Sequence, residues 1–241
     1  TASGIANFRN VNAVVGGNGT DTLNGLNAAS SWQLSVNSYQ YVSTNTLTFS
    51  GVETLNGGTG DDTLAFSGDA TLSALGATDG FDISVAGFNG IFRNINTLIG
   101  DSGADSLNGL SAATTWNVNA IRHSLYAISQ SLTFSAIETV NGGSAIDTFN
   151  INGTPIINPN GGAGDDVFNF AANANLTGVI DGQGGSDTFS YASFNASITV
   201  TLNSVGVTDG FNGTASALNG TFANIDSIIG SSYVSGPPEG P

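Results

Sequence analysis

The chain has 241 residues, of which 18 are acidic and three are arginine, so its formal net charge is −15. This acidic balance argues against nucleic acid and anionic membranes as partners, because both repel negative charge. The absence of cysteine excludes disulfides and thiol chemistry, and no apolar run approaches the ~18 residues that a membrane span requires.

A glycine-rich nonapeptide recurs along the chain. The pattern Gly-Gly-x-Gly-x-Asp-x-U-x, in which U is a large apolar residue, is complete at 16–24, 57–65 and 161–169. Degraded copies lie at 100–107, 142–149 and 182–189. Three intact copies in one chain are a strong signal of a repeat architecture.

The spacing of these motifs predicts the length of one structural unit. Their aspartates are Asp21, Asp62, Asp105, Asp147, Asp166 and Asp187. The first three intervals between these aspartates are about twice as long as the last two. A second signature, which runs from Phe8 to Gly16, recurs from Phe49, Phe92, Phe134 and Phe222. One unit of about 20–21 residues accounts for both series and predicts one coil of a solenoid.

Longer repeats are superimposed on this period. The stretch Leu23–Trp32 recurs as Leu107–Trp116, and Thr78–Phe81 recurs as Thr208–Phe211. Residues 214–230 also resemble residues 1–16. This likeness indicates either a tandem array of long units or a subunit whose two ends are structurally alike.

The local pattern predicts strands throughout. Short β-branched and aromatic runs alternate with turn residues, and ten Asn-Gly dipeptides offer positive φ angles at the corners. We therefore predict an all-β fold, a right-handed parallel β-solenoid of about 11 coils that spans residues 1–230, with a Pro/Gly-rich tail at 231–241. The alternative fold is an antiparallel β-sandwich. The residues predicted to point into the core are Leu23, Leu64, Leu107, Phe149, Phe168 and Phe189.

The nonapeptides resemble the RTX (repeats-in-toxin) repeats in the solenoid regions of large secreted bacterial adhesins and extracellular matrix proteins. The resemblance implies a secreted protein of the bacterial cell surface or biofilm matrix. It also implies that turn carbonyls and the motif aspartate bind Ca²⁺ between stacked turns. RTX repeats are normally uninterrupted, whereas the motifs here are isolated. Between residues 21 and 147 we expect them on every second coil, roughly 10 Å apart and too far to share an ion.

Calcium is therefore expected first in the segment 142–190, where motif aspartates fall on consecutive coils. The candidate ligands are Gly161, Gly162, Gly164, Asp166, Asp181, Gly182, Asp187 and Asp147, with Asp62 and Asp21 as further candidates. The alternative is that each aspartate caps corner amides through Asx-turn hydrogen bonds, with no metal.

Other chemistry-bearing residues favour structural roles. The pairs Asp61-Asp62 and Asp165-Asp166 sit on adjacent positions that point to opposite faces, which suits no shared substrate. The lone histidine, His123, is predicted to lie on the surface. Trp32 and Trp116 occupy equivalent repeat positions, which favours a packing or capping role over stacking on sugars.

These observations predict a non-enzymatic extracellular module that acts as a spacer or assembles head-to-tail into filaments, or as tandem copies in a longer chain. One alternative is a calcium-binding adhesin fragment that binds a carbohydrate, such as a cell-surface or matrix polysaccharide, or another surface. The other is a β-helix enzyme that acts on polysaccharides, which the absence of lysine disfavours. Neither nucleic acid nor membrane insertion is expected.

Overall fold

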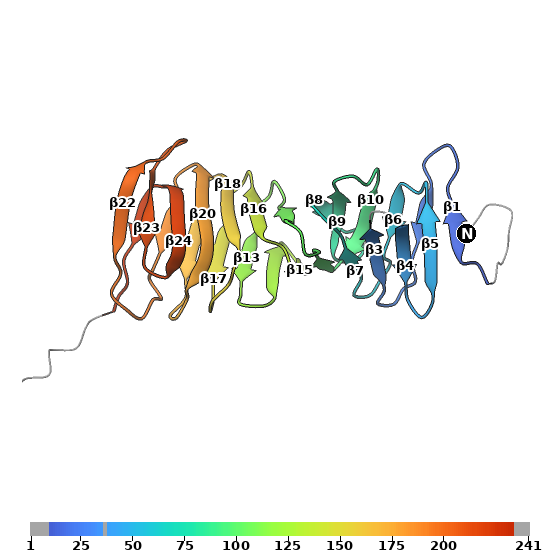
Figure 1. Cartoon of the computed structure of the whole chain (residues 1–241), viewed down its shortest axis with the longest axis horizontal. Helices are drawn as coiled ribbons and strands as arrows, with labels where there is room; N and C mark the ends of the chain where they lie inside the picture. Colours follow the sequence, from blue (N-terminus) through green and yellow to red (C-terminus); the bar gives the residue numbers. More distant parts are fainter. Residues whose placement is uncertain (1–9, 36–37, 234–241) are drawn as a thin grey trace, which may run out of the picture.

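The computed structural model describes residues 10–35 and 38–233. Its 25 strands form two long sheets that face each other across one core, and no described residue is helical. Figure 1 shows an elongated rod with β1 near one end and β22 at the other. At a strand spacing of ~4.8 Å, thirteen strands give a rod roughly 60 Å long.

The strands are ordered across each sheet as follows. The thirteen-stranded sheet consists of β1 (Ala13–Val15), β5 (Thr46–Ser50), β4 (Ser38–Val42), β3 (Ser31–Ser35), β7 (Thr63–Ala65), β11 (Thr97–Ile99), β15 (Gln130–Ser135), β14 (His123–Ala127), β13 (Thr115–Val118), β17 (Thr148–Ile151), β19 (Val167–Phe170), β21 (Thr188–Ser190) and β25 (Ser227–Ile229). The twelve-stranded sheet consists of β2 (Thr22–Asn24), β6 (Thr54–Asn56), β10 (Ile91–Ile95), β9 (Phe81–Val85), β8 (Asp69–Leu75), β12 (Ser106–Asn108), β16 (Thr139–Gly143), β18 (Asn158–Ala163), β20 (Leu176–Gly184), β24 (Leu218–Ile225), β23 (Phe211–Ala215) and β22 (Val200–Val205).

The chain alternates between the two sheets, and most neighbouring strands are parallel, so the predicted β-solenoid is confirmed. The predicted coil length holds where coils are uninterrupted. In register, Phe149 pairs with Phe168 and Phe168 pairs with Phe189, so each step along the sheet spans one predicted unit of sequence. These three rings line the core one above another.

Four three-stranded antiparallel meanders interrupt the coils, and the sequence analysis did not foresee them. They are β3–β4–β5, β8–β9–β10, β13–β14–β15 and β22–β23–β24. In each meander the chain moves ahead and then folds back, so that β3 contacts the following strand β7 and β5 contacts the preceding strand β1. The extra residues between widely spaced motifs form these meanders, and the expectation of eleven equal coils is wrong.

The core is lined by the predicted inward residues. The side chains of Leu64, Leu107, Phe149, Phe168 and Phe189 are fully buried, whereas Leu23 on the edge strand β2 is half-buried. Of the packing and capping roles that the sequence left open for the tryptophans, the structure shows packing, since Trp32 and Trp116 are fully buried.

His123 is not on the surface as expected. It begins β14, only 6% of its side chain is exposed, and its ring stacks on Phe134 with centroids 5.0 Å apart. Its Nδ1 accepts a hydrogen bond from the Asn119 amide at 3.2 Å. The interpretation failed because the meander strand β14 directs alternate residues into the core, and His123 holds one of those positions.

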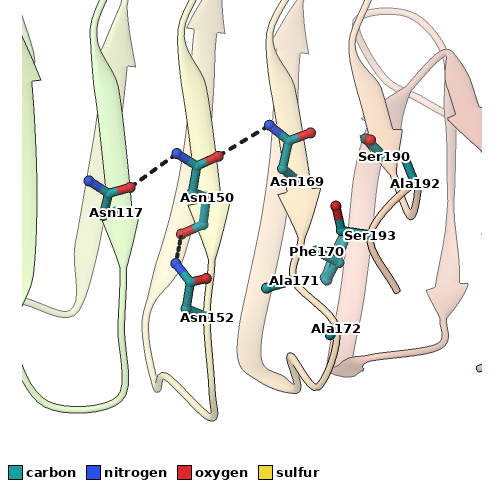
Figure 2. A pocket seen from close by; sticks show the side chains of 10 residues that line it. All are labelled: Asn117, Asn150, Asn152, Asn169, Phe170, Ala171, Ala172, Ser190, Ala192 and Ser193. Carbon is teal, nitrogen blue, oxygen red and sulfur yellow. Dashed lines mark hydrogen bonds between the residues drawn. The ribbon is translucent and has the colours of Figure 1, made fainter. Parts of the chain in front are cut away.

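The Asn-Gly dipeptides supply the expected positive φ at only two glycines, Gly19 and Gly153. None of their described asparagines has a positive φ. Several instead face away from the core and form side-chain amide ladders across parallel strands. On the twelve-stranded sheet Asn141 Nδ2 donates to Asn108 Oδ1 at 2.6 Å and Asn160 Nδ2 donates to Asn141 Oδ1 at 2.7 Å. Figure 2 shows a similar ladder of asparagines on the thirteen-stranded sheet, which lines a shallow polar pocket.

The aromatic ladder makes a prediction for stability. The Phe168 ring lies 4.9 Å from that of Phe149 and 5.9 Å from that of Phe189, so Phe168→Ala leaves a cavity in a closely packed stack. We expect a loss of about 3–5 kcal/mol in the free energy of unfolding, measured by denaturant titration. Ile156→Ala, which truncates an exposed side chain, is the control and should change stability little. Equal losses in both variants would contradict the role of the stack.

Candidate metal centre

The motif aspartates lie at the two corners of the solenoid, directly before strands. We call the turns that lead into the thirteen-stranded sheet the entry corner, and those that lead out of it the exit corner. Asp62, Asp147, Asp166 and Asp187 precede β7, β17, β19 and β21 at the entry corner, and all four side chains are fully buried. Asp21 and Asp105 precede β2 and β12 at the exit corner.

This arrangement corrects the expected spacing of the isolated motifs. Asp21 and Asp62 do not lie two coils apart on one edge, because they occupy different corners. Where a meander lies between two successive motif aspartates, the chain crosses between the sheets three times from one to the next. The second aspartate therefore lies at the opposite corner. A unit without a meander crosses twice, which keeps Asp147, Asp166 and Asp187 in one row as predicted.

Hydrogen bonds join this row into a ladder. The amide of Asp147 donates to Asp166 Oδ1 at 2.7 Å, and the amide of Asp166 donates to Asp187 Oδ1 at 2.9 Å. The ladder continues at both ends, where the amide of Thr114 donates to Asp147 Oδ1 at 2.6 Å and the amide of Asp187 donates to Asp226 Oδ2 at 3.0 Å. Each carboxylate thus caps a backbone amide one coil away, and this capping extends beyond a local Asx turn.

At the exit corner the motif aspartates accept hydrogen bonds from backbone amides, through both carboxylate oxygens at Asp105 and through one at Asp21. Asp105 Oδ1 accepts from the Gly68 amide and Oδ2 accepts from the Asp101 amide at 2.5 and 2.8 Å. Asp21 Oδ2 accepts from the Gly17 amide at 2.8 Å. Asp21 therefore behaves as a capping residue in the described structure.

The spacing between the first motif glycine and the aspartate has a steric cause. A Cβ on Gly161 would lie 2.3 Å from Asp166 Oδ2, and one on Gly182 would lie 2.3 Å from Asp187 Oδ2. The carboxylate folds back against the bare glycine Cα and stays inside the corner. Gly162 and Gly164 shape the same turn with φ angles of 107° and 122°, which residues with a Cβ rarely adopt.

Asp181 is the one candidate from segment 142–190 whose carboxylate lies away from this row. It extends the asparagine ladder of the twelve-stranded sheet, because its Oδ1 accepts from Asn224 Nδ2 at 2.7 Å. The same oxygen accepts from the Gln183 amide at 3.0 Å. Asp181 directly precedes Gly182, the first glycine of its motif, and Asp187 follows the motif glycines. The sequence alone does not show that these two aspartates have different roles.

At the entry corner one oxygen of each buried aspartate has no hydrogen-bond partner. These atoms are the Oδ2 atoms of Asp62, Asp147, Asp166 and Asp187. Among the described residues the single ion pair joins Arg93 to Asp82 at 2.9 Å, so no protein cation neutralises the row. An unpaired oxygen on a buried carboxylate is costly unless a proton or a cation compensates it.

Burial accordingly shifts the acidity of these groups. It raises the pKa of Asp62 and of Asp166 to about 6, and that of Asp187 to about 7. Burial also raises the pKa of Asp147. Neighbouring carboxylates add to the upward shift at Asp62, Asp166 and Asp187, while hydrogen bonds to their charged forms oppose it.

The row supplies oxygens of the kind that Ca²⁺ binds. Calcium takes several hard oxygens from carboxylates and backbone carbonyls in flexible geometry. Around the Cα of Gly182, the Asp187 Oδ2 atom and the Asn224 carbonyl oxygen both approach the point where a Cβ would lie, at 2.3 and 2.1 Å. Gly161 has the same surroundings, with Asp166 Oδ2 at 2.3 Å and the Gly182 carbonyl oxygen at 2.7 Å. Carboxylate and carbonyl oxygens of successive coils therefore gather at one place.

The glycine packing makes a prediction with an internal control. Gly182→Ala places a methyl group 2.1 Å from the Asn224 carbonyl oxygen, whereas Gly184→Ala meets nothing closer than a Thr208 methyl carbon at 3.6 Å. We expect Gly182→Ala to reduce the free energy of unfolding by about 1–3 kcal/mol and Gly184→Ala to be nearly neutral, as measured by denaturant titration. A neutral Gly182→Ala variant would contradict the steric explanation of the motif.

Comparison with known proteins finds a calcium-binding repeat in a part of the chain that lies outside the row of Asp147, Asp166 and Asp187. The family model described as RTX calcium-binding nonapeptide repeat (4 copies) matches residues 47–65 and 93–113, which include one intact and one degraded motif. Comparisons with curated proteins and with solved structures found no match. Among the described residues there is also no helix long and apolar enough to cross a membrane. Residues 47–65 and 93–113 are thus similar to RTX calcium-binding nonapeptide repeats, and their motifs lie at turns of a β-solenoid.

Proposed function

We propose that this chain is a non-enzymatic extracellular spacer, a rigid β-solenoid whose entry corner is stabilised by calcium. The observation that carries the proposal is the set of four buried motif aspartates at the entry corner, three of them in consecutive coils, each with one oxygen that no described protein group pairs. Calcium would neutralise these charges and join consecutive coils. The matched family supports calcium as the ion.

An extracellular location agrees with this use of calcium. Extracellular modules bind calcium with dissociation constants of roughly 10⁻⁴–10⁻³ M, so they stay loaded only where calcium is abundant. The chain has no cysteine that could be oxidised outside the cell. The nonapeptides of this chain resemble the RTX repeats of secreted bacterial adhesins, and this likeness supports a cell-surface or matrix location.

The acidic residues support a structural role in preference to catalysis. In each adjacent pair one carboxylate is buried in the corner and the other is exposed, as with Asp62 and Asp61 or Asp166 and Asp165. The buried member already accepts a hydrogen bond from its neighbours, from the Ser30 hydroxyl at Asp62 and from the Asp147 amide at Asp166. Such a pair does not present two carboxylates to one substrate.

Calcium and pH should compete at the entry corner. The folded-state pKa values of Asp62, Asp166 and Asp187 lie above the ordinary value of 3.8, so without calcium the folded state holds more protons than the unfolded chain. Their contribution to stability is complete below about pH 4 and is lost as the pH rises through about 6 to 7.

We therefore expect the Tm in calcium-free buffer to fall between about pH 5 and pH 8, and the Tm gain from added calcium to grow over the same range. Thermal unfolding followed by circular dichroism measures both. A calcium effect of equal size at both pH values would count against binding at these carboxylates.

The internal repeats also supply a template for end-to-end assembly. Strand β22 resembles β8 in sequence, and β2 resembles β12. Inside the chain β12 pairs with β8 in parallel, with Leu107 opposite Ala70. Among the described strands β22 and β2 end the twelve-stranded sheet at opposite ends of the rod. We propose that β2 of a further copy, in another chain or in tandem, pairs with β22 as β12 pairs with β8.

Electron microscopy of the purified chain, with calcium and with a chelator, tests assembly between separate chains. We expect filaments of uniform width in calcium. Thr201→Lys places a charge on the exposed edge strand β22 and should shorten them, while Ser102→Lys in an exposed loop is the charge-matched control. Single rods of about 60 Å in every condition would contradict assembly between separate chains and leave the tandem spacer.

A further inference from the structure

Three carboxylates from separate parts of the chain converge where the last meander meets the entry corner. Asp187 precedes β21, Asp209 lies in the turn between β22 and β23, and Asp226 precedes β25. One oxygen of each lies within 4.8 Å of the others. We propose that these three aspartates bind a calcium ion that clamps the C-terminal meander to the solenoid. The inference rests on the proposed calcium function and extends it to two residues outside the nonapeptides.

The carboxylates are held in place before any ion arrives. Asp187 Oδ1 accepts from the Asp166 amide at 2.9 Å, and Asp209 Oδ2 accepts from the Gly185 amide at 3.1 Å. Asp226 Oδ2 accepts from the Asp187 amide at 3.0 Å. Each group is therefore fixed by one backbone N–H, which lowers the entropy that ion binding would otherwise cost.

Buried oxygens without partners point to a ligand. The Asp187 side chain is fully buried and its Oδ2 has no hydrogen-bond partner. The buried Oδ1 of Asp209 likewise has none. The ion pair found among the described residues involves none of the three aspartates, so a triad with a charge of up to −3 lies without a protein cation. A hard cation satisfies both the charge and the free oxygens.

The turn that carries Asp209 is itself well defined. The Gly206 amide donates to the Gly210 carbonyl at 3.0 Å and closes the turn, and the Thr208 amide donates to Asn224 Oδ1 at 3.2 Å. These bonds hold the turn against β24. An ion between Asp209 and the two corner aspartates would add a second attachment, from the meander to β21 and β25.

The chain contains a near copy of this triad. Asp79 lies in the equivalent turn between β8 and β9, its Oδ2 accepts from the Gly60 amide at 3.3 Å, and its Oδ1 is also buried without a partner. Asp62 takes the place of Asp187. The third position is Asn96, whose Oδ1 accepts from the Asp62 amide at 3.0 Å as Asp226 does from Asp187. The copy thus has one carboxylate fewer. Calcium binds more weakly to a site with fewer charged ligands, so this copy should have the lower affinity.

Calcium titration of the full chain by isothermal calorimetry tests the proposal, with magnesium as the comparison ion. Asp209→Asn and Asp226→Asn keep the shape and the hydrogen-bond acceptor but remove one charge each. We expect either variant to lose one bound calcium ion or to bind it about tenfold more weakly. Asp79→Asn, the matched control in the other meander, should have a smaller effect. Magnesium should bind more weakly, because it demands near-octahedral geometry.

Hydrogen–deuterium exchange reports the clamp directly. In the wild-type chain calcium should slow the exchange of amides in β22 and β23, and in Asp209→Asn it should protect them less. Asp61→Asn removes one exposed carboxylate that belongs neither to the triad nor to the buried motif aspartates, so it should keep the protection of β22 and β23.

The outcomes separate the two proposals. Calcium binding that is unchanged in both Asp209→Asn and Asp226→Asn would overturn the triad and leave the entry-corner function standing. A wild-type chain that binds no calcium would overturn both. Circular dichroism spectra that match the wild type would establish that the variants fold.

Discussion

The burial of a motif carboxylate at four turns of the entry corner is the constraint on which much of the structure depends. At a corner the backbone turns from one sheet to the other, and this leaves an amide N–H that needs an acceptor. The motif aspartate one coil along supplies that acceptor, as Asp166 does for the amide of Asp147. The first motif glycine admits the carboxylate, because a Cβ there would collide with it. Backbone capping and charge burial therefore come together, and the remaining oxygen creates the demand for a proton or a calcium ion.

The meanders explain how two sheets of nearly equal length coexist with uneven motif spacing. Each meander adds two strands to one sheet, and two meanders lie in each sheet, so one has thirteen strands and the other twelve. A meander also moves the next motif to the other corner. A continuous aspartate row is therefore confined to the stretch without meanders, from Asp147 to Asp187, and the triad begins where the next meander returns to it.

The sequence predicts the features that depend on periodicity and misses those that depend on strand direction. Alternation of apolar and polar residues places Phe149, Phe168 and Phe189 in the core whichever way a strand runs. For the same reason it does not reveal that β4, β9, β14 and β23 run antiparallel to their neighbours. The buried His123 follows from that omission, since it holds an inward position on β14. The triad was missed because Asp226 lies in no glycine motif, although the repeated Thr-Asp-Gly-Phe turn marked Asp209.

Aromatic packing joins coils in both halves of the rod, and the C-terminal half adds a row of buried carboxylates to it. Near the N-terminal end the core is an aromatic cluster, in which Trp32 lies 4.5 Å from Tyr41 and 5.8 Å from Phe49 between ring centroids. Dispersion and burial stabilise that cluster without regard to calcium or to pH. Toward the C-terminal end, the consecutive buried carboxylates add a term that depends on both. A solenoid is stabilised locally, coil against coil. Loss of calcium should therefore loosen the C-terminal coils first, while the coils around Trp32 keep their packing, and the ion would control one half of the rod more than the other.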